Sequence, residues 1–144
     1  MSETVWAAGL LCRDGSLLLA RRTSRRRLYP GMWDLPGGHA EAGEDASVAL
    51  CRELREELGV EPASWELLGR ADVPVGEEVI DYQIFLVRAW VGEPSNRSPE
   101  EHSEVRWFSF DQAAALPLAD ARYRNVFARA ARLTGPRVST EPTS

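Results

Sequence analysis

The segment over residues 38–60, GHAEAGEDASVALCRELREELGV, constrains the fold of this chain more than any other. Residues 46–58 contain neither Gly nor Pro and are rich in Ala, Leu, Glu and Arg, which favour a helix. Asp45 or Glu44 can accept hydrogen bonds from the free N–H groups of the first turn, and Gly59 suits the left-handed conformation that often ends a helix. We therefore predict a helix over residues 46–58 that begins just after a glycine-rich turn.

This helix should present a buried stripe and an acidic stripe side by side. Leucines at positions 50, 54 and 58 recur every fourth residue, as expected of a face that packs on a core. With about 100° of rotation per residue, three glutamates fall within roughly 100° of one another on the neighbouring face. They are Glu53, Glu56 and Glu57. The carboxylates should therefore lie at the edge of the buried face, where a cleft can form.

Carboxylates at this spacing repel one another, and a bound cation would remove the conflict. Glu53 and Glu57 form a like-charge pair of the kind that destabilises a helix by about 0.2–0.5 kcal/mol. Mg²⁺ prefers oxygen ligands and binds through a few carboxylates, substrate phosphates and water. The alternative is a solvated acidic face that Arg52 and Arg55 neutralise. Arg52 is also a candidate partner for Glu44.

The whole segment resembles the Nudix box, the signature of the Nudix hydrolases. That signature reads Gly, five residues, Glu, seven residues, Arg-Glu, an aliphatic residue, any residue, Glu-Glu, any residue, Gly and an aliphatic residue. Its fixed positions are matched by Gly38, Glu44, Arg52, Glu53, Leu54, Glu56, Glu57, Gly59 and Val60. So many matches at the correct spacing make a specific signal. The pattern is most similar to that of the MutT-type nucleoside triphosphate pyrophosphohydrolases.

Around this segment the sequence predicts several strands. Apolar runs at 5–12 and 16–20 flank an Arg-Asp-Gly turn and indicate a hairpin. Alternating or β-branched runs predict further strands. These cover residues 32–35, 65–73, 79–91 and 104–110.

Two shorter helices should follow the last of these strands. Asp111 can begin a helix that ends near residue 116, and Asp120 can begin another that ends near residue 133. This α/β pattern predicts a mixed β-sheet between helices, and the resemblance implies the Nudix α/β/α sandwich. We expect a single Nudix hydrolase domain over residues 1–134 and a disordered C-terminal tail over residues 135–144.

Charge and composition narrow the range of partners. The 144 residues carry a formal net charge of −5, so we expect neither a membrane nor a long nucleic acid as partner. No apolar run is long enough to cross a bilayer, and the first residues lack the basic start of a signal peptide. Cys12 and Cys51 are too few for a disulfide scaffold. We predict a cytoplasmic protein, and an exposed strand edge could support a homodimer.

By resemblance, the chain should hydrolyse a nucleoside diphosphate linked to a further group, with Mg²⁺ as cofactor and Mn²⁺ as an alternative. Cleaving a phosphoanhydride requires neutralised phosphate charge and an activated, aligned water, and metal ions supply both. The resemblance implies metal binding by the Gly38 carbonyl and by the side chains of Glu53, Glu56 and Glu57. It implies that Glu44 and Arg52 hold the loop against the helix.

The resemblance makes the three box glutamates and Glu101 candidate catalytic residues. For the general base, Glu56 is one candidate and Glu101 the other, because a second carboxylate often comes from a loop outside the box. Glu101 precedes Trp107 by six residues, much as an acidic residue precedes the equivalent strand in MutT-type members. The alternative reading of Glu101 is a surface residue beside Glu100. His102 could contact phosphate or carry a proton, although lone histidines usually do neither.

Four residues outside the box are candidates for substrate binding. Arg22 follows the second strand, where MutT-type proteins place a phosphate-binding arginine, but it is also one of five arginines in a polar loop. Asp120 stands where such proteins carry an Asn that reads the purine. An ionised Asp only accepts hydrogen bonds, so it could pair with guanine N–H groups or simply cap the last helix. Leu35 and Phe85 are candidate walls of a base pocket, although such residues more often lie in the core.

The expected reaction converts a nucleoside triphosphate, oxidised or not, into the monophosphate and pyrophosphate. Alternative substrates are ADP-ribose, nucleotide sugars, dinucleoside polyphosphates and capped RNA. A nucleotide-sensing Nudix domain without catalysis is a further alternative, but such domains often lose the box carboxylates that this chain keeps.

Overall fold

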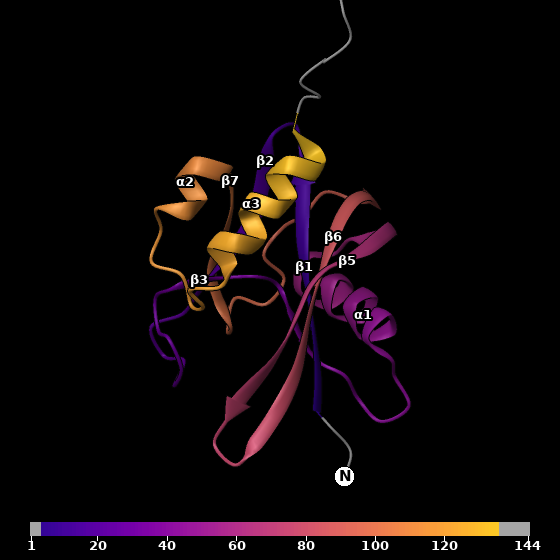
Figure 1. The fold of residues 1–144 in the computed structure, drawn as a ribbon, viewed down its shortest axis with the longest axis vertical. Helices are drawn as coiled ribbons and strands as arrows, with labels where there is room; N and C mark the ends of the chain where they lie inside the picture. The colour runs from indigo at the N-terminus through magenta and orange to yellow at the C-terminus, as the bar shows by residue number, and fades with distance from the viewer. Residues whose placement is uncertain (1–3, 136–144) are drawn as a thin grey trace, which may run out of the picture.

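The computed structural model describes residues 4–135 (Figure 1). The strands are β1 (Thr4–Arg13), β2 (Ser16–Arg22), β3 (Trp33–Asp34), β4 (Gly37–His39), β5 (Glu61–Val75), β6 (Glu78–Val91) and β7 (His102–Ser109). The helices are α1 (Ala46–Leu58), α2 (Phe110–Ala114) and α3 (Tyr123–Thr134). Nearly all of the tail predicted to be disordered lies outside the described residues.

The strands form one mixed sheet, as predicted. Its order is β3-β2-β1-β6-β5, and β4 pairs with β1 while β7 pairs with β2. The β1–β6 pair is parallel, whereas the other pairs are antiparallel. β5 begins earlier than predicted because residues from Glu61 onward still pair with β6.

Helices cover both faces of this sheet, which gives the layers of the predicted sandwich (Figure 1). Alternate residues of β1, β2 and β6 point to opposite sides, as strand geometry requires. One set forms a core with Tyr123, Phe127 and Ala130 of α3. The other forms a core with Leu50, Leu54 and Leu58 of α1.

Helix α1 has the bounds that the sequence predicts. The Asp45 carboxylate accepts a hydrogen bond from the Val48 N–H, and Gly59 ends the helix in the left-handed conformation with φ of 73°. Its three leucines are fully buried, and Leu54 packs against the bare Cα of Gly9 in β1. The helix is therefore fixed at both ends and along one face, which sets the direction of its glutamates.

The two later helices begin differently from the prediction. Ser109, not Asp111, caps α2, because its hydroxyl and the Gln112 side chain form a reciprocal capping box. Helix α3 begins at Tyr123, and the Asp120 carboxylate instead accepts the Arg122 N–H in the turn before it. Helix α3 has no side-chain cap, but the N-cap positions of both helices lie within two residues of the predicted ones, so the order of the elements is as predicted.

None of the helices described in residues 4–135 has the length and apolar character needed to span a membrane.

Candidate active site

Glu57 is the buried carboxylate of α1, and only 3% of the residue is exposed. Its Oε2 accepts a hydrogen bond of 2.6 Å from the Gly37 backbone N–H in β4. Its Oε1 shares a hydrogen bond of 3.1 Å with Nε2 of His102, at the start of β7. Contacts on both oxygens fix the direction of this carboxylate.

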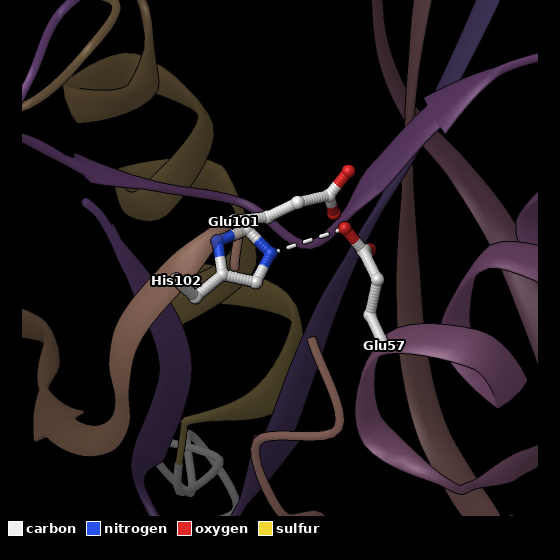
Figure 2. Close-up of side chains that lie close together, drawn as sticks. All are labelled: Glu57, Glu101 and His102. Carbon is white, nitrogen blue, oxygen red and sulfur yellow. Dashed lines mark hydrogen bonds and ion pairs between the residues drawn. The ribbon is translucent and has the colours of Figure 1, made fainter. Parts of the chain in front are cut away.

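Glu101 brings a second carboxylate to the same place. Figure 2 shows the Glu57 and Glu101 carboxylates close together, with the His102 ring beside them. One ligand atom from each of the three residues lies within 4.8 Å of the others. The preceding loop is folded so that the N–H groups of residues 101 and 102 both donate to the Ser98 carbonyl at 2.9 Å. Such a group can hold a metal ion.

Arg52 joins the glycine-rich turn to the acidic face of α1. Its Nε and one terminal nitrogen donate to the Glu44 carboxylate at 2.8 and 2.9 Å. It also donates to the His39 carbonyl at 3.1 Å, and to Glu53 and Glu56 at 3.0 and 3.2 Å. The hydrogen bond from Arg52 lowers the pKa of Glu44. The structure thus brings together the two residues that the sequence assigns to holding the loop.

Glu53 and Glu56 both lie against Arg52, outside the group of Glu57, Glu101 and His102. The Glu53 side chain is 14% exposed and that of Glu56 is 57% exposed. A Cβ on Gly38 would lie only 2.6 Å from a Glu53 carboxylate oxygen. The Glu53 carboxylate therefore uses the space that a side chain at position 38 would fill.

These carboxylates crowd one another electrostatically. Burial, with smaller contributions from the charges of Glu53 and Glu101, raises the pKa of Glu57 to about 7 despite the hydrogen bond from His102. Burial also raises the pKa of Glu53 despite the hydrogen bond and charge of Arg52, and the charges of Glu56 and Glu101 add to the rise. A hard divalent cation would relieve this repulsion, and a donor set of carboxylate oxygens suits Mg²⁺. The residues present therefore fit a hard divalent cation.

A cavity of about 510 Å³ opens on the α3 side of the sheet. It lies between β6, the tip of the β5–β6 hairpin and the start of α3. Its polar lining includes Arg22, Asp34, Tyr82, Asp120, Arg122 and Tyr123. Its size is that of a site for a small organic ligand.

Arg22 is the cavity residue that pairs with the strand carrying His102. It lines the cavity, and in the β2–β7 pair it lies opposite His102. Its guanidinium donates to Asp34 at 2.9 Å and to the Leu28 carbonyl at 2.7 Å. Trp6, on another wall, pairs across β1–β4 with the residue after Gly38. A ligand in the cavity thus lies next to strands that pair with β4, which contains Gly37 and Gly38, and with β7, which begins at His102.

The other residues predicted to bind substrate occupy different places. Asp120 lines the cavity, where its carboxylate pairs with Arg122 at 2.7 Å. Leu35 and Phe85 are buried in the two cores and are not among the residues that line the cavity. Phe85 packs in the α1 core, whereas the cavity opens on the α3 side. The wall role of these two residues stays a prediction.

Comparison with known proteins decides the family. Residues 3–130 match the NUDIX domain. The chain belongs to the NUDIX family. It is 34% identical over 114 residues to the CTP pyrophosphohydrolase of Escherichia coli strain K12, covering 79% of this chain and 82% of that protein. It is 32% identical over 117 residues to the 8-oxo-dGTP diphosphatase of Haemophilus influenzae, covering 81% and 85%.

Solved NUDIX structures have the same fold. A MutT NUDIX hydrolase from Burkholderia pseudomallei superimposes with a TM-score of 0.78 at 30% identity, over 90% of this chain and 98% of that one. The E. coli ORF135 protein superimposes with a TM-score of 0.79 at 29% identity, over 96% of each chain. The NUDIX resemblance, the mixed sheet and the hydrolase class predicted from the sequence are therefore confirmed.

The sequence gives little reason to expect a role for His102, but in the structure its ring contacts Glu57. Both residues are buried, and they lie 45 positions apart in the chain. The signal in the sequence was the position of His102 directly after the candidate base Glu101 and at the start of a strand. Hydrogen bonds from a neighbouring group commonly orient metal-binding side chains, and His102 makes such a contact here.

Proposed function

We propose that this NUDIX hydrolase cleaves nucleoside triphosphates to the monophosphate and pyrophosphate, with Mg²⁺ as its cofactor. One observation supports this most: Arg22 lines a cavity of about 510 Å³ and pairs across β2–β7 with His102, which belongs to the group of Glu57, Glu101 and His102. Relatives named for hydrolysis of CTP and 8-oxo-dGTP add support. In this arrangement the base and sugar occupy the cavity while the phosphates lie over the box.

The metal would be held by the side chains of Glu53, Glu56 and Glu57 and by the Gly38 carbonyl. When bound, it would supply charge neutralisation at the phosphates and a more acidic water. Arg52 and Glu44 keep the turn against α1, and His102 and the Gly37 N–H hold Glu57 in place.

We assign general-base catalysis to Glu101. It reaches the carboxylate group from a loop rather than from the helix, and it lies beside Glu57 (Figure 2). Its carboxylate would accept the proton of the attacking water, a step that is typically worth about 10²–10⁴ in rate. Arg22 would bind a phosphate oxygen, for which it must share its guanidinium with Asp34.

The cytoplasmic location belongs to this proposal, and both cysteines are free, as a reducing compartment requires. The predicted homodimer stays a prediction.

The test is a panel of nucleotides with product analysis, with and without EDTA. The panel contains nucleoside triphosphates, ADP-ribose, a nucleotide sugar, a dinucleoside polyphosphate and capped RNA. We expect EDTA-sensitive release of monophosphate and pyrophosphate from triphosphates, and collapse of turnover in Glu56→Gln and Glu57→Gln. Undiminished activity in both variants would contradict the assignment of Glu56 and Glu57 as metal ligands. Preferred cleavage of another substrate in the panel would contradict the proposed triphosphate substrate.

A further inference from the structure

Three residues in the wall of the larger cavity form a chain of hydrogen bonds. Tyr123 donates its hydroxyl proton to Oδ1 of Asp34 at 2.6 Å. The hydroxyl oxygens of Tyr82 and Tyr123 lie 2.5 Å apart. All three residues line the cavity, and they come from β3, β6 and α3.

The number of protons fixes the direction of this chain. Asp34 also accepts hydrogen bonds from the Leu35 N–H at 2.8 Å and from Arg22 at 2.9 Å, so it acts only as an acceptor. The single proton of Tyr123 is therefore used on Asp34. The hydrogen bond between the two tyrosines must then use the proton of Tyr82. Burial raises the pKa of both tyrosines well above the usual value, so each hydroxyl keeps its one proton.

Tyr82 can consequently offer a ligand only lone pairs. Asp120 is a second acceptor in the same wall, because hydrogen bonds from Arg122 lower its pKa against the effect of burial. Tyr82 and Asp120 both line the larger cavity and also a smaller one of about 210 Å³ between β5, β6 and α3. They therefore border the same region. Arg122 also lines both cavities, and its Nε and one terminal nitrogen donate to the Asp120 carboxylate at 3.0 and 2.7 Å. A base in the cavity would meet Tyr82 and Asp120 as two hydrogen-bond acceptors.

We propose that Tyr82 and Asp120 select a nucleobase with an exocyclic amino group over one with a carbonyl group at the same ring position. This inference rests on the proposed function, since it names the base of that substrate. An amino group carries two hydrogens, one for each acceptor. A carbonyl oxygen has none and would face lone pairs on both sides, which leaves buried polar groups unpaired. Tyr123 acts as a positioning residue, because it holds the Tyr82 proton away from the ligand.

Two matched pairs of substrates test the proposal, CTP against UTP and ATP against inosine triphosphate. Each pair differs by an amino group replaced with a carbonyl, together with the adjacent ring proton. For the wild-type protein we expect kcat/KM to favour CTP and ATP by at least about tenfold. Hydrolysis of all four at equal rates would overturn this inference and leave the proposed function standing. Failure to hydrolyse any of the four would overturn this inference, and the proposed function would fall with it only if the wider panel also showed no turnover of a triphosphate.

Two tyrosine variants separate recognition from mere structural support. Tyr82→Phe removes an acceptor, so CTP turnover should fall by about tenfold while UTP turnover changes little. Tyr123→Phe frees the Tyr82 proton to donate into the cavity, so UTP turnover should rise in absolute terms. If the tyrosines had only a structural role, each variant would turn over CTP and UTP more slowly by the same factor. That result would overturn the proposal.

Tyr29→Phe is the matched control, with the CTP-to-UTP ratio as its readout. Tyr29 is 53% exposed at the rim of the cavity, and within residues 4–135 its hydroxyl makes no hydrogen bond to another side chain. The ratio should therefore stay at the wild-type value. Thermal unfolding of all three variants shows whether each remains folded at the assay temperature.

Discussion

Two neighbouring glutamates in the loop before β7 allow a test of the proposed general base. Glu101 lies within the carboxylate group, whereas Glu100 is exposed to solvent. Glu101→Gln should lower kcat by about 10²–10⁴, the usual contribution of a general base. Glu100→Gln makes the same chemical change one residue away and should keep wild-type kcat. Steady-state kinetics on the preferred triphosphate measures both, and equal kcat in the two variants would exclude Glu101 as the base.

Replacement by alanine should have different effects at the two adjacent glycines of β4, one on stability and the other on activity. A Cβ on Gly37 would lie 2.2 Å from the Ala7 carbonyl oxygen, and its φ of 151° is one that side chains rarely adopt. Gly37→Ala should therefore disrupt the β1–β4 pair and cost several kcal/mol, roughly 3 or more. A Cβ on Gly38 would meet only the movable end of Glu53. Gly38→Ala should displace that carboxylate, and so lower activity with a stability loss below about 1 kcal/mol.

Urea unfolding and kinetics on the same two samples distinguish these outcomes. Gly38 is the informative position, because loss of activity in a folded variant reports on the Glu53 carboxylate. A Gly38→Ala protein with full activity would show that Glu53 does not need its present position.

At the scale of elements, the sequence predicts best what depends on neighbours in the chain. Helix α1 was placed correctly at both ends, since its cap, its leucine stripe and Gly59 all act locally. The start of α3 was placed too early, because the Asp120 carboxylate serves a turn before the helix as well as it would serve the helix itself. One sequence does not show whether such a carboxylate accepts a hydrogen bond from the turn or from the first turn of the helix.

An ion pair within the β5–β6 hairpin should make stability depend on pH. Asp81 is 3% exposed, and two hydrogen bonds of 2.7 Å from Arg70 lower its pKa. Because the pKa is lower in the folded than in the unfolded state, the stabilisation is present above the unfolded value of about 3.9. It is lost as the pH falls through the lower, folded value.

Asp81→Asn should therefore destabilise the protein by about 1–3 kcal/mol at pH 7, and by less below pH ~4. Urea unfolding of both proteins at the two pH values measures this difference. Asp72→Asn, at the exposed position opposite in the β5–β6 pair, is the control and should show no such pH-dependent loss. If the free energy of unfolding of Asp81→Asn differed from that of wild type by the same amount at both pH values, the charge of Asp81 would contribute nothing to stability.

At the scale of the whole molecule, the candidate site depends on contacts that no local pattern reveals. The box glutamates could be predicted because one helix carries them. The Glu57–His102 contact joins residues 45 positions apart, and the Tyr123–Asp34 contact joins residues 89 apart. Both arise from how the chain is arranged around the sheet, which places β7 beside β2 and the segment before α3 beside β3. Single residues such as Leu35 could be recognised as apolar, but their side of the sheet could not be assigned.

A metal that binds only the folded chain should stabilise the entire molecule. At a concentration 100 times Kd, such binding adds about 2.7 kcal/mol, which corresponds to a rise in Tm on the order of 5–10 °C for a chain of this size. A net charge of −5 means that any salt reduces self-repulsion, so NaCl at equal ionic strength must be the reference. The quantity to measure is the Tm in MgCl₂ minus the Tm in that NaCl.

In a double variant, Glu56→Gln with Glu57→Gln, the Tm in MgCl₂ should equal the Tm in NaCl, even if both values differ from those of wild type. Glu77→Gln with Glu78→Gln is the matched control, because it removes the same charge from exposed positions in the β5–β6 turn and at the start of β6. That control should keep the full rise with MgCl₂. An equal rise in both double variants would mean that Mg²⁺ stabilises the chain through its overall charge. Because this measurement needs no substrate, it tests the metal site independently of which nucleotide the enzyme hydrolyses.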